Sequence, residues 1–234
     1  VLVRYPDGIK GNHFYQKDFS KTAPPWIKTV SVKHSANKTV GYCLCNDLQT
    51  LLWLVNQGAI ELPPWLSRTP SLRNPDYLVF DLDPAPASPF ADVIFLALMF
   101  KQVLAEFGLQ GFLKTSGASG LHIFVPLIPQ YTYPQVTKAG EFLANIVAAA
   151  YPKQSTVERL IKNRGDRVYL DYLQNGYGKT LVSVYSLRPK LRAPVSIPLT
   201  WEEISQTGPV SFHPADFNIK TAISRVEQVG DRFA

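Results

Sequence analysis

The sequence predicts a mixed α/β (α+β) fold, because strand-like and helix-like segments alternate along it. Apolar strands are expected over 77–84 and 167–172 and on both sides of a turn within 111–125. Helices are expected over 90–107 and 134–150. Hydrophobic residues make up 46% of the 234 residues and aromatic residues 12%, which is typical of a folded globular protein. We therefore expect one substantial domain over residues 1–234.

Two carboxylates interrupt the apolar strand 77–84, which Pro84 must end. Successive strand side chains alternate in direction, so Asp81 and Asp83 project from one face about 7 Å apart. Two carboxylates held this close are unfavourable unless a cation lies between them, and a divalent ion with oxygen ligands is the usual solution. The alternative, in which Asp83 and Pro84 only start a turn, leaves Asp81 unexplained.

The segment 111–125 has the features of a phosphate-binding hairpin. Two apolar strands flank the turn Ser116-Gly117-x-x-Gly120, and His122 lies just inside the second strand. Glycines let backbone amides approach an anion closely, and the serine hydroxyls and the histidine add donors. Taken alone, such a turn is more often only a hairpin, and a lone strand histidine is more often a core residue.

A third acidic residue, Asp171, lies at the end of the strand 167–172, with basic residues around it. If Asp171 converges with Asp81 and Asp83, the three carboxylates complete a two-metal clamp for phosphoryl or nucleotidyl transfer.

These motifs, in this order, resemble the polymerase domain of bacterial DNA ligase D, a member of the archaeo-eukaryotic primase superfamily. The resemblance rests on Asp81 to Pro84, Thr115 to His122, Asp171 to Asn175 and Tyr185 to Arg188, and it runs from Arg4 to Phe233. It implies an RRM-like catalytic palm with mixed β-sheets flanked by helices. It also implies template-dependent nucleotide addition, as a DNA polymerase or primase, at DNA ends in non-homologous end joining.

The resemblance also implies roles for individual residues. Asp81, Asp83 and Asp171 are expected to be catalytic and to bind two divalent ions, Mn²⁺ or Mg²⁺. Binding of the incoming NTP or dNTP is expected of Ser116, Gly117, Gly120, His122, Arg164, Gln174 and Arg188. Contact with DNA is expected of Phe14, Tyr15 and Lys17, with the two aromatic rings stacking on template bases. The alternative for these rings is that one lies in the core, since adjacent strand residues face opposite ways.

The expected partners are double-stranded DNA ends with gaps or overhangs, nucleoside triphosphates, Ku and a DNA ligase, and the chain is expected to be a monomer. A formal charge of +6 and a pI near 9.2 suit a polyanionic partner without establishing one. The longest apolar run, 93–100, is far too short to cross a bilayer, and the start of the chain does not resemble a signal peptide. A cytoplasmic, nucleoid-associated location is the default expectation.

The sequence departs from the pattern of the resembled family at three places. Pro63 stands where the family usually has histidine in Glu-Leu-His-Pro-Trp, and Ala118 and Ser119 replace a Ser-Lys pair. Several dozen residues that precede Val1 in relatives, with lysines that hold a DNA 5′-phosphate, are missing from this sequence. The loss of a lysine at position 119 predicts weaker nucleotide affinity.

These departures keep two other function classes open. One is a truncated or degenerate module that binds DNA ends or nucleotides without polymerising. The other is a metal-dependent phosphoesterase using the same carboxylates, which the order of the motifs disfavours.

Several local features complete the prediction. Asn46 or Asp47 is expected to cap a helix that runs to Gln57, and Ser88 is expected to cap the helix over 90–107. Two further capped helices are expected over 200–203 and 218–230. The two cysteines, Cys43 and Cys45, are expected to be reduced and buried, because their spacing on a strand disfavours a mutual disulfide.

Overall fold

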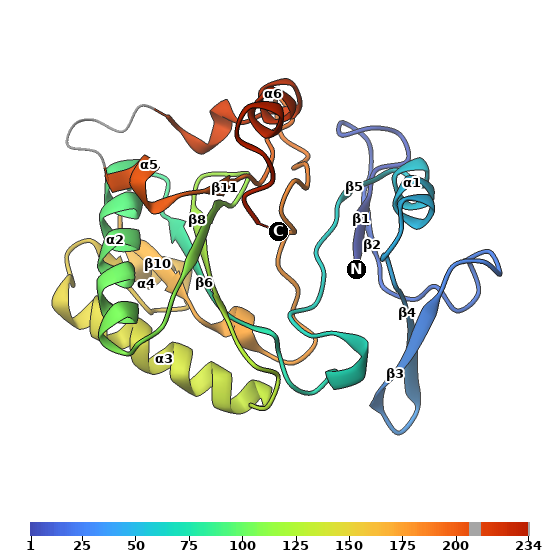
Figure 1. The fold of residues 1–234 in the computed structure, drawn as a ribbon, viewed down its shortest axis with the longest axis horizontal. Coiled ribbons are helices and arrows are strands. Elements are labelled where there is room, and N and C mark those ends of the chain that lie inside the picture. The colour runs from blue at the N-terminus through green and yellow to red at the C-terminus, as the bar shows by residue number, and fades with distance from the viewer. Residues whose placement is uncertain (206–211, 234) are drawn as a thin grey trace.

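The computed structural model describes residues 1–205 and 212–233 and contains three β-sheets (Figure 1). The largest has six strands in the order β11-β7-β8-β6-β10-β9, the second has the order β2-β1-β5, and the third pairs β3 with β4. The strands are β1 (Leu2–Arg4), β2 (Phe14–Gln16), β3 (Thr29–Ser35), β4 (Lys38–Cys43), β5 (Ala59–Glu61), β6 (Tyr77–Pro84), β7 (Phe112–Thr115), β8 (Leu121–Pro126), β9 (Ser155–Thr156), β10 (Val168–Asp171) and β11 (Pro198–Leu199). The helices are α1 (Leu48–Asn56), α2 (Phe90–Glu106), α3 (Tyr133–Ala150), α4 (Ile161–Arg164), α5 (Trp201–Ser205) and α6 (Ile219–Val229).

The centre of the large sheet has the arrangement expected of an RRM-like palm. Its elements follow the order β6-α2-β7-β8-α3-β10, and the four strands lie in the spatial order β7-β8-β6-β10 with every neighbour antiparallel. This is the β-α-β-β-α-β arrangement in which the first and third strands are central. The predicted fold class and the predicted strands and helices of this region are confirmed.

One face of the large sheet forms the main hydrophobic core against α2 and α3. Phe80 and Leu82 of β6 are completely buried there, and the rings of Phe80 and Phe100 lie 4.5 Å apart. The opposite face carries the alternating residues of the same strands, among them Val79, which packs in a smaller cluster with Leu66. In Figure 1 both helices lie on one side of the sheet, while β1 to β5 and α1 form a separate group beside it. The carboxylates of β6 therefore project from the face that the two long helices leave uncovered.

The helix ends agree with the sequence at two places and differ at one. The carboxylate of Asp47 accepts a hydrogen bond of 2.7 Å from the amide of Thr50, so the predicted cap of α1 is confirmed. Asn218 caps α6 in the same way. The predicted capping role of Ser88 is wrong, because its hydroxyl instead donates to the carbonyl of Asp166, 78 residues away. None of the helices in the two described ranges is long and apolar enough to span a membrane.

The two cysteines are free, as predicted, but only one of them is even partly buried. Cys43 closes β4 and is half-buried, and burial raises the pKa of its thiol to about 11. Cys45 is exposed, so the prediction of a buried thiol is wrong for it. The strand ends at Cys43, and the chain then leaves the sheet toward α1, which takes Cys45 out of the packed layer.

Candidate functional site

Strand register places four ionisable side chains in one row across the face of the large sheet opposite α2 and α3. Lys114 pairs with His122, His122 with Asp81, and Asp81 with Asp171, on the consecutive strands β7, β8, β6 and β10. Directly opposed residues of antiparallel strands point to the same side and lie about 5 Å apart at their Cα atoms. Asp83 lies on the same face, two residues beyond Asp81. The three predicted carboxylates are therefore brought to one face by two neighbouring strands.

Each of the three carboxylates has its own polar partner. Asp81 Oδ1 lies 3.3 Å from His122 Nε2, and Asp83 Oδ2 lies 3.5 Å from a guanidinium nitrogen of Arg164. Asp171 accepts hydrogen bonds from the side-chain amide of Gln174 at 2.9 Å, from the backbone amide of Leu173 at 2.8 Å and from the hydroxyl of Tyr169 at 3.3 Å. These contacts hold the carboxylates apart and fix their directions.

The pKa values show that the three carboxylates are electrostatically unequal. The pKa values of Asp171 and Asp83 are both raised. In each case burial is the larger cause and the negative charge of Asp81 is the second. Burial alone would raise the pKa of Asp81 as well, but its contact with His122 and the positive charges of Lys114 and Arg188 hold it below the usual value. The face therefore carries an excess of buried negative charge, centred on Asp81.

The donor set fits a divalent cation. Carboxylate oxygens are the ligands that Mg²⁺ and Mn²⁺ prefer, and a bound cation would relieve the repulsion that raises the pKa values of Asp83 and Asp171. As placed in residues 1–205 and 212–233, no three side chains of His, Cys, Asp or Glu converge closely enough to hold a metal ion. The carboxylates would have to exchange their present partners, such as Arg164 and Gln174, for the ion.

The glycine hairpin lies between β7 and β8 and is closed by Ser116. The hydroxyl of Ser116 accepts hydrogen bonds of 3.1 Å from the amides of both Ala118 and Gly120, so these two amides point into the turn. The amides of Gly117 and Ser119 have no hydrogen-bond acceptor among the described residues. Gly117 has φ +72, a conformation that favours glycine, and Ser119 is exposed. Two of the four amides of the turn thus lack an acceptor, and of these two residues Ser119 is exposed while Gly117 is buried.

Gly120 is required by the close approach of two strands. A Cβ atom at this position would lie 2.1 Å from the backbone carbonyl oxygen of Leu82 on β6. The hairpin therefore presses directly against the strand that carries Asp81 and Asp83. This contact sets the distance between the predicted phosphate cradle and the carboxylates.

Arg188 connects the glycine hairpin to the three-stranded sheet. Its Nε atom lies 2.9 Å from a carboxylate oxygen of Glu61 on β5, and a terminal nitrogen donates to the carbonyl of Ser116 at 3.4 Å. Arg164 is fixed from the other side of the site, because its guanidinium lies 3.8 Å from the ring centroid of Tyr169 and donates to two backbone carbonyls. Both arginines are held rigidly next to the carboxylate face, as anion binding requires.

The three predicted DNA contacts lie away from this face. Phe14 and Tyr15 are on β2, the edge strand of the three-stranded sheet, and Lys17 directly follows it. Phe14 is 45% exposed and Tyr15 66% exposed, so the alternative in which one ring is a core residue is wrong. The ring of Phe14 has the guanidinium of Arg4 5.0 Å from its centroid, while Tyr15 is the more accessible of the two. Neither ring shares a sheet with the carboxylates.

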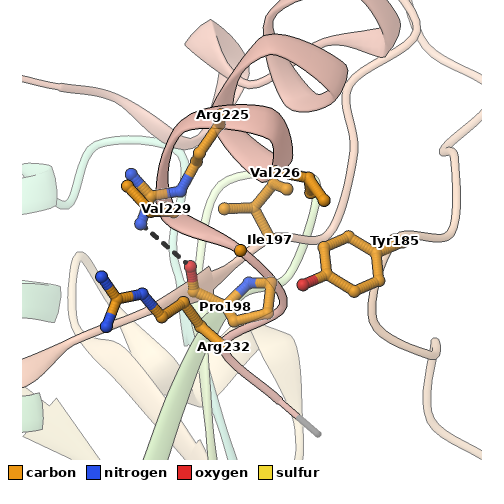
Figure 2. A pocket seen from close by; sticks show the side chains of 8 residues that line it. Tyr185, Ile197, Pro198, Arg225, Val226, Val229 and Arg232 are labelled. Atoms are coloured by element: carbon orange, nitrogen blue, oxygen red, sulfur yellow. Dashed lines mark hydrogen bonds between the residues drawn. The ribbon is translucent and has the colours of Figure 1, made fainter.

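Two hollows border these elements, and only one of them adjoins the site. The first has a volume of about 260 Å³ and lies at the end of β6, where Pro84, Ser88, Ser119 and His213 are among its lining residues. It provides open, polar space beside the hairpin. Figure 2 shows the second, between α6 and β11, where Arg225 donates to the carbonyl of Pro198. Its lining includes no carboxylate or hairpin residue, and it is too small to admit a water molecule.

Sequence reasoning missed Glu61 as a neighbour of the site, and it considered Lys114 only as a cation that could offset the absence of a lysine at position 119. A signal for Lys114 was present, since Lys114 and His122 lie four residues on either side of Ala118, and a symmetric hairpin pairs such positions. For Glu61 no local signal exists, because its contact joins β5 to Arg188 in a loop far along the chain.

Comparison with known proteins assigns this arrangement to a family. The sequence model described as LigD, primase-polymerase domain, matches residues 1–233. The chain belongs to this family. It is a family of nucleotidyltransferases, and its members include the relatives described next.

The LigD relatives are longer proteins. The bifunctional non-homologous end joining protein LigD of Bacillus subtilis (strain 168) is 35% identical over all of this chain, which covers 37% of that protein. The multifunctional LigD of Pseudomonas aeruginosa is 32% identical over 87% of this chain and 24% of that protein. The chain thus spans about a third or less of the LigD proteins that it matches here.

A solved structure shares the fold of this LigD family member. The polymerase domain of Mycobacterium tuberculosis ligase D, in complex with DNA, superimposes with a TM-score of 0.89 at 28% identity. The match covers 99% of this chain and 81% of that chain. The predicted family and its α/β architecture are therefore confirmed.

Proposed function

We propose that this chain is a template-dependent nucleotidyltransferase that extends or fills DNA ends during non-homologous end joining. The observation that supports this function best is the set of three carboxylates on one face of an RRM-like sheet in a LigD family member. A glycine hairpin and two fixed arginines adjoin these carboxylates, which suits a triphosphate beside a divalent ion.

In the proposed reaction Asp81, Asp83 and Asp171 hold two divalent ions, Mn²⁺ or Mg²⁺. When bound, the ions lower the pKa of the primer 3′-hydroxyl and neutralise charge on the attacking and leaving oxygens. The chain itself orients the nucleotide. The amides of Gly117 and Ser119, which have no acceptor in the turn, donate hydrogen bonds to the triphosphate at the hairpin.

The remaining predicted nucleotide ligands act as donors around the same triphosphate. Arg188 and Arg164 provide guanidinium groups on two sides of the face, and Gln174 keeps Asp171 in place until the ion binds. Ser116 shapes the turn, because its hydroxyl oxygen accepts from two amides, and its hydroxyl proton is left to donate to a phosphate oxygen. His122 is buried and burial lowers the pKa of its imidazole to about 4, so it is neutral and directs its single N–H at Asp81 rather than at the triphosphate.

The experiment that tests this function is extension of a labelled primer on gapped duplex DNA with a 5′-phosphate. Mn²⁺ is compared with Mg²⁺, and ribonucleotides with deoxynucleotides, because the residues do not decide either preference. Templated addition supports the proposed function. Nucleotide binding without addition under any of these conditions would instead identify a binding module, and release of nucleotides from DNA would identify a phosphoesterase.

For the DNA we propose that the exposed rings of β2 stack on unpaired template bases, with Lys17 near the backbone. A Tyr15→Ala variant is expected to bind gapped DNA roughly tenfold more weakly, because one stacked base contributes about 1 to 3 kcal/mol. Fluorescence anisotropy with labelled DNA measures this affinity. Phe142→Ala, which removes an exposed aromatic ring from α3, is the control and should leave it unchanged. Equal affinities for Tyr15→Ala and the unaltered chain would contradict the stacking role.

A lysine at position 119 is expected to strengthen nucleotide binding. Ser119 is exposed at the tip of the hairpin and adjoins the 260 Å³ hollow, so an added ammonium group reaches a bound triphosphate without disturbing the core. We expect Ser119→Lys to lower the nucleotide dissociation constant about threefold to tenfold, the range for one solvent-accessible charged contact. Isothermal titration with a non-hydrolysable nucleotide measures it. Ser119→Gln, of similar length but neutral, controls for side-chain size, and equal constants for all three proteins would refute the idea.

We also propose that the chain acts as a monomer in the cytoplasm, at DNA ends held by Ku and sealed by a DNA ligase. The names of its LigD relatives place those proteins in non-homologous end joining. Co-sedimentation of the chain with Ku bound to a DNA end tests the partnership, and co-sedimentation no greater than with bare DNA would argue against it.

A further inference from the structure

Lys114 is the one member of the ionisable row that the proposed reaction does not use. It occupies the position opposite His122 on β7, and its side chain is 0% exposed. Its Nζ atom lies 2.8 Å from Nδ1 of His122 and 2.6 Å from the hydroxyl oxygen of Ser196. The ring centroid of Phe124 lies 5.5 Å from the same atom. A lysine ammonium is thus held completely inside the protein, directly behind the histidine.

The hydrogen bonds around Lys114 leave one consistent set of donors and acceptors. The hydroxyl of Ser196 donates its proton to the carbonyl of Thr115 at 2.6 Å, so toward Lys114 it acts as an acceptor. At the other end of the row, Nε2 of His122 faces a carboxylate oxygen of Asp81 at 3.3 Å, a long contact that favours a proton on Nε2 without fixing it there. A neutral imidazole with its proton on Nε2 has an acceptor at Nδ1. Lys114 therefore donates to Nδ1 of His122.

A buried lysine that had no role in the site would be energetically unfavourable. Burial lowers the pKa of Lys114 well below its usual value, which shows that the protein interior opposes its charge. An apolar side chain of similar volume at such a position is often neutral or stabilising. Its presence behind the carboxylate face therefore points to a role in the site rather than in packing.

We propose that Lys114 is a positioning residue for nucleotidyl transfer, which acts through His122. By donating to Nδ1 it fixes the imidazole in the tautomer with a proton on Nε2 and aims that proton at Asp81. The histidine in turn fixes the direction of the central carboxylate, which lies between Lys114 and His122 on one side and Asp171 on the other. This inference rests on the proposed function, because it assigns Asp81 to the reaction.

The test compares Lys114→Met with the unaltered chain in the primer extension assay. Methionine fills the buried space but has no proton to donate to Nδ1. Loss of an outer partner of a metal-ligand network typically costs 10-fold to 100-fold, so we expect kcat to fall by about that factor. The KM for nucleotide should change less than threefold, because the hairpin amides and the arginines are unaltered. Lys101→Met, at an exposed lysine of α2, is the control and should retain full activity.

A double variant distinguishes positioning from a general structural effect. If Lys114 acts through His122, adding Lys114→Met to His122→Ala should cause less than a twofold further loss, since coupled residues are not additive. A loss in the double variant equal to the product of the single losses would overturn the proposal. A fall in melting temperature that alone accounts for the lost activity of Lys114→Met would overturn it as well.

A second measurement does not depend on activity. Nitrogen-15 NMR of the metal-free protein reports which imidazole nitrogen carries the proton, and the four histidines are assigned with His122→Ala as the reference. We expect a single tautomer with the proton on Nε2 in the unaltered chain and a mixture in Lys114→Met. An unchanged tautomer in the variant would refute the role of Lys114. If the unaltered chain does not extend primers, the proposed function fails, and this spectrum still decides whether Lys114 sets the tautomer of His122.

Discussion

An Asp83→Ala variant is expected to lose primer extension by at least about 10³-fold while it remains folded. A bound metal ion contributes several kcal/mol to the transition state of phosphoryl transfer, and each 1.36 kcal/mol corresponds to a factor of ten in rate. The variant removes one carboxylate from the face that would hold the ion. The side chain of Asp83 is 54% exposed, and its ion-pair partner Arg164 keeps its contacts with the ring of Tyr169 and with two backbone carbonyls. The fold therefore loses little.

The matched control for this variant is Asp166→Ala. Asp166 is an exposed acidic residue just before β10, outside the carboxylate row, so its loss changes the net charge equally without touching the site. Single-nucleotide addition and a circular dichroism spectrum should be recorded for both variants. Efficient extension by Asp83→Ala, with the spectrum unchanged, would exclude Asp83 as a metal ligand in the reaction.

Replacement of Gly120 by alanine is expected to destabilise the fold by about 3 kcal/mol, a value typical of a severe backbone clash. The added Cβ would lie 2.1 Å from the carbonyl oxygen of Leu82, and neither group is at the end of a flexible side chain. To relieve the clash, the hairpin must move away from β6. We therefore expect the nucleotide affinity to fall together with the free energy of unfolding, because the open amides then shift relative to Asp81 and Asp83.

Urea denaturation measures the loss of stability, and Gly176→Ala provides the comparison. Gly176 has an ordinary φ of −81, and an added Cβ would meet mainly the Cγ atom of the flexible Lys179 side chain at 3.1 Å. Its loss of stability should stay below about 1 kcal/mol. If Gly120→Ala is as stable as Gly176→Ala, the close packing of the hairpin on β6 is not as described.

The glycine hairpin between β7 and β8 shows how far local sequence information reaches. Its glycines and the alternation of apolar residues indicated two strands and a turn, and the structure has both. The sequence also suggested that the backbone amides of the turn form a phosphate cradle. The structure modifies this interpretation, because the hydroxyl of Ser116 binds the amides of Ala118 and Gly120 and leaves only two others open. Which amides of a turn remain free depends on side-chain rotamers that no pattern of residue types specifies.

Two local predictions failed, one because a distant group competed with a nearby one and one because a strand ended early. Ser88 has the residue type and the position of a helix cap. Its hydroxyl instead donates a hydrogen bond to the backbone carbonyl of Asp166, which lies within reach. Cys45 has a spacing that puts it on a strand with Cys43, but the strand ends at Cys43, two residues before it. In both places the local propensity is worth only about 1 kcal/mol, which one tertiary contact can outweigh.

The sequence by itself determined the order of the elements and the face of each strand on which the carboxylates lie. These properties depend on periodicity, on turn residues and on proline, and all of them act over a few neighbouring residues. Only the tertiary structure decided that β6 lies between β8 and β10, so that Lys114, His122, Asp81 and Asp171 form one row. Strand order and register depend on the packing of residues that are far apart in the chain, so the row exists only once the two long helices have packed on the opposite face of the sheet.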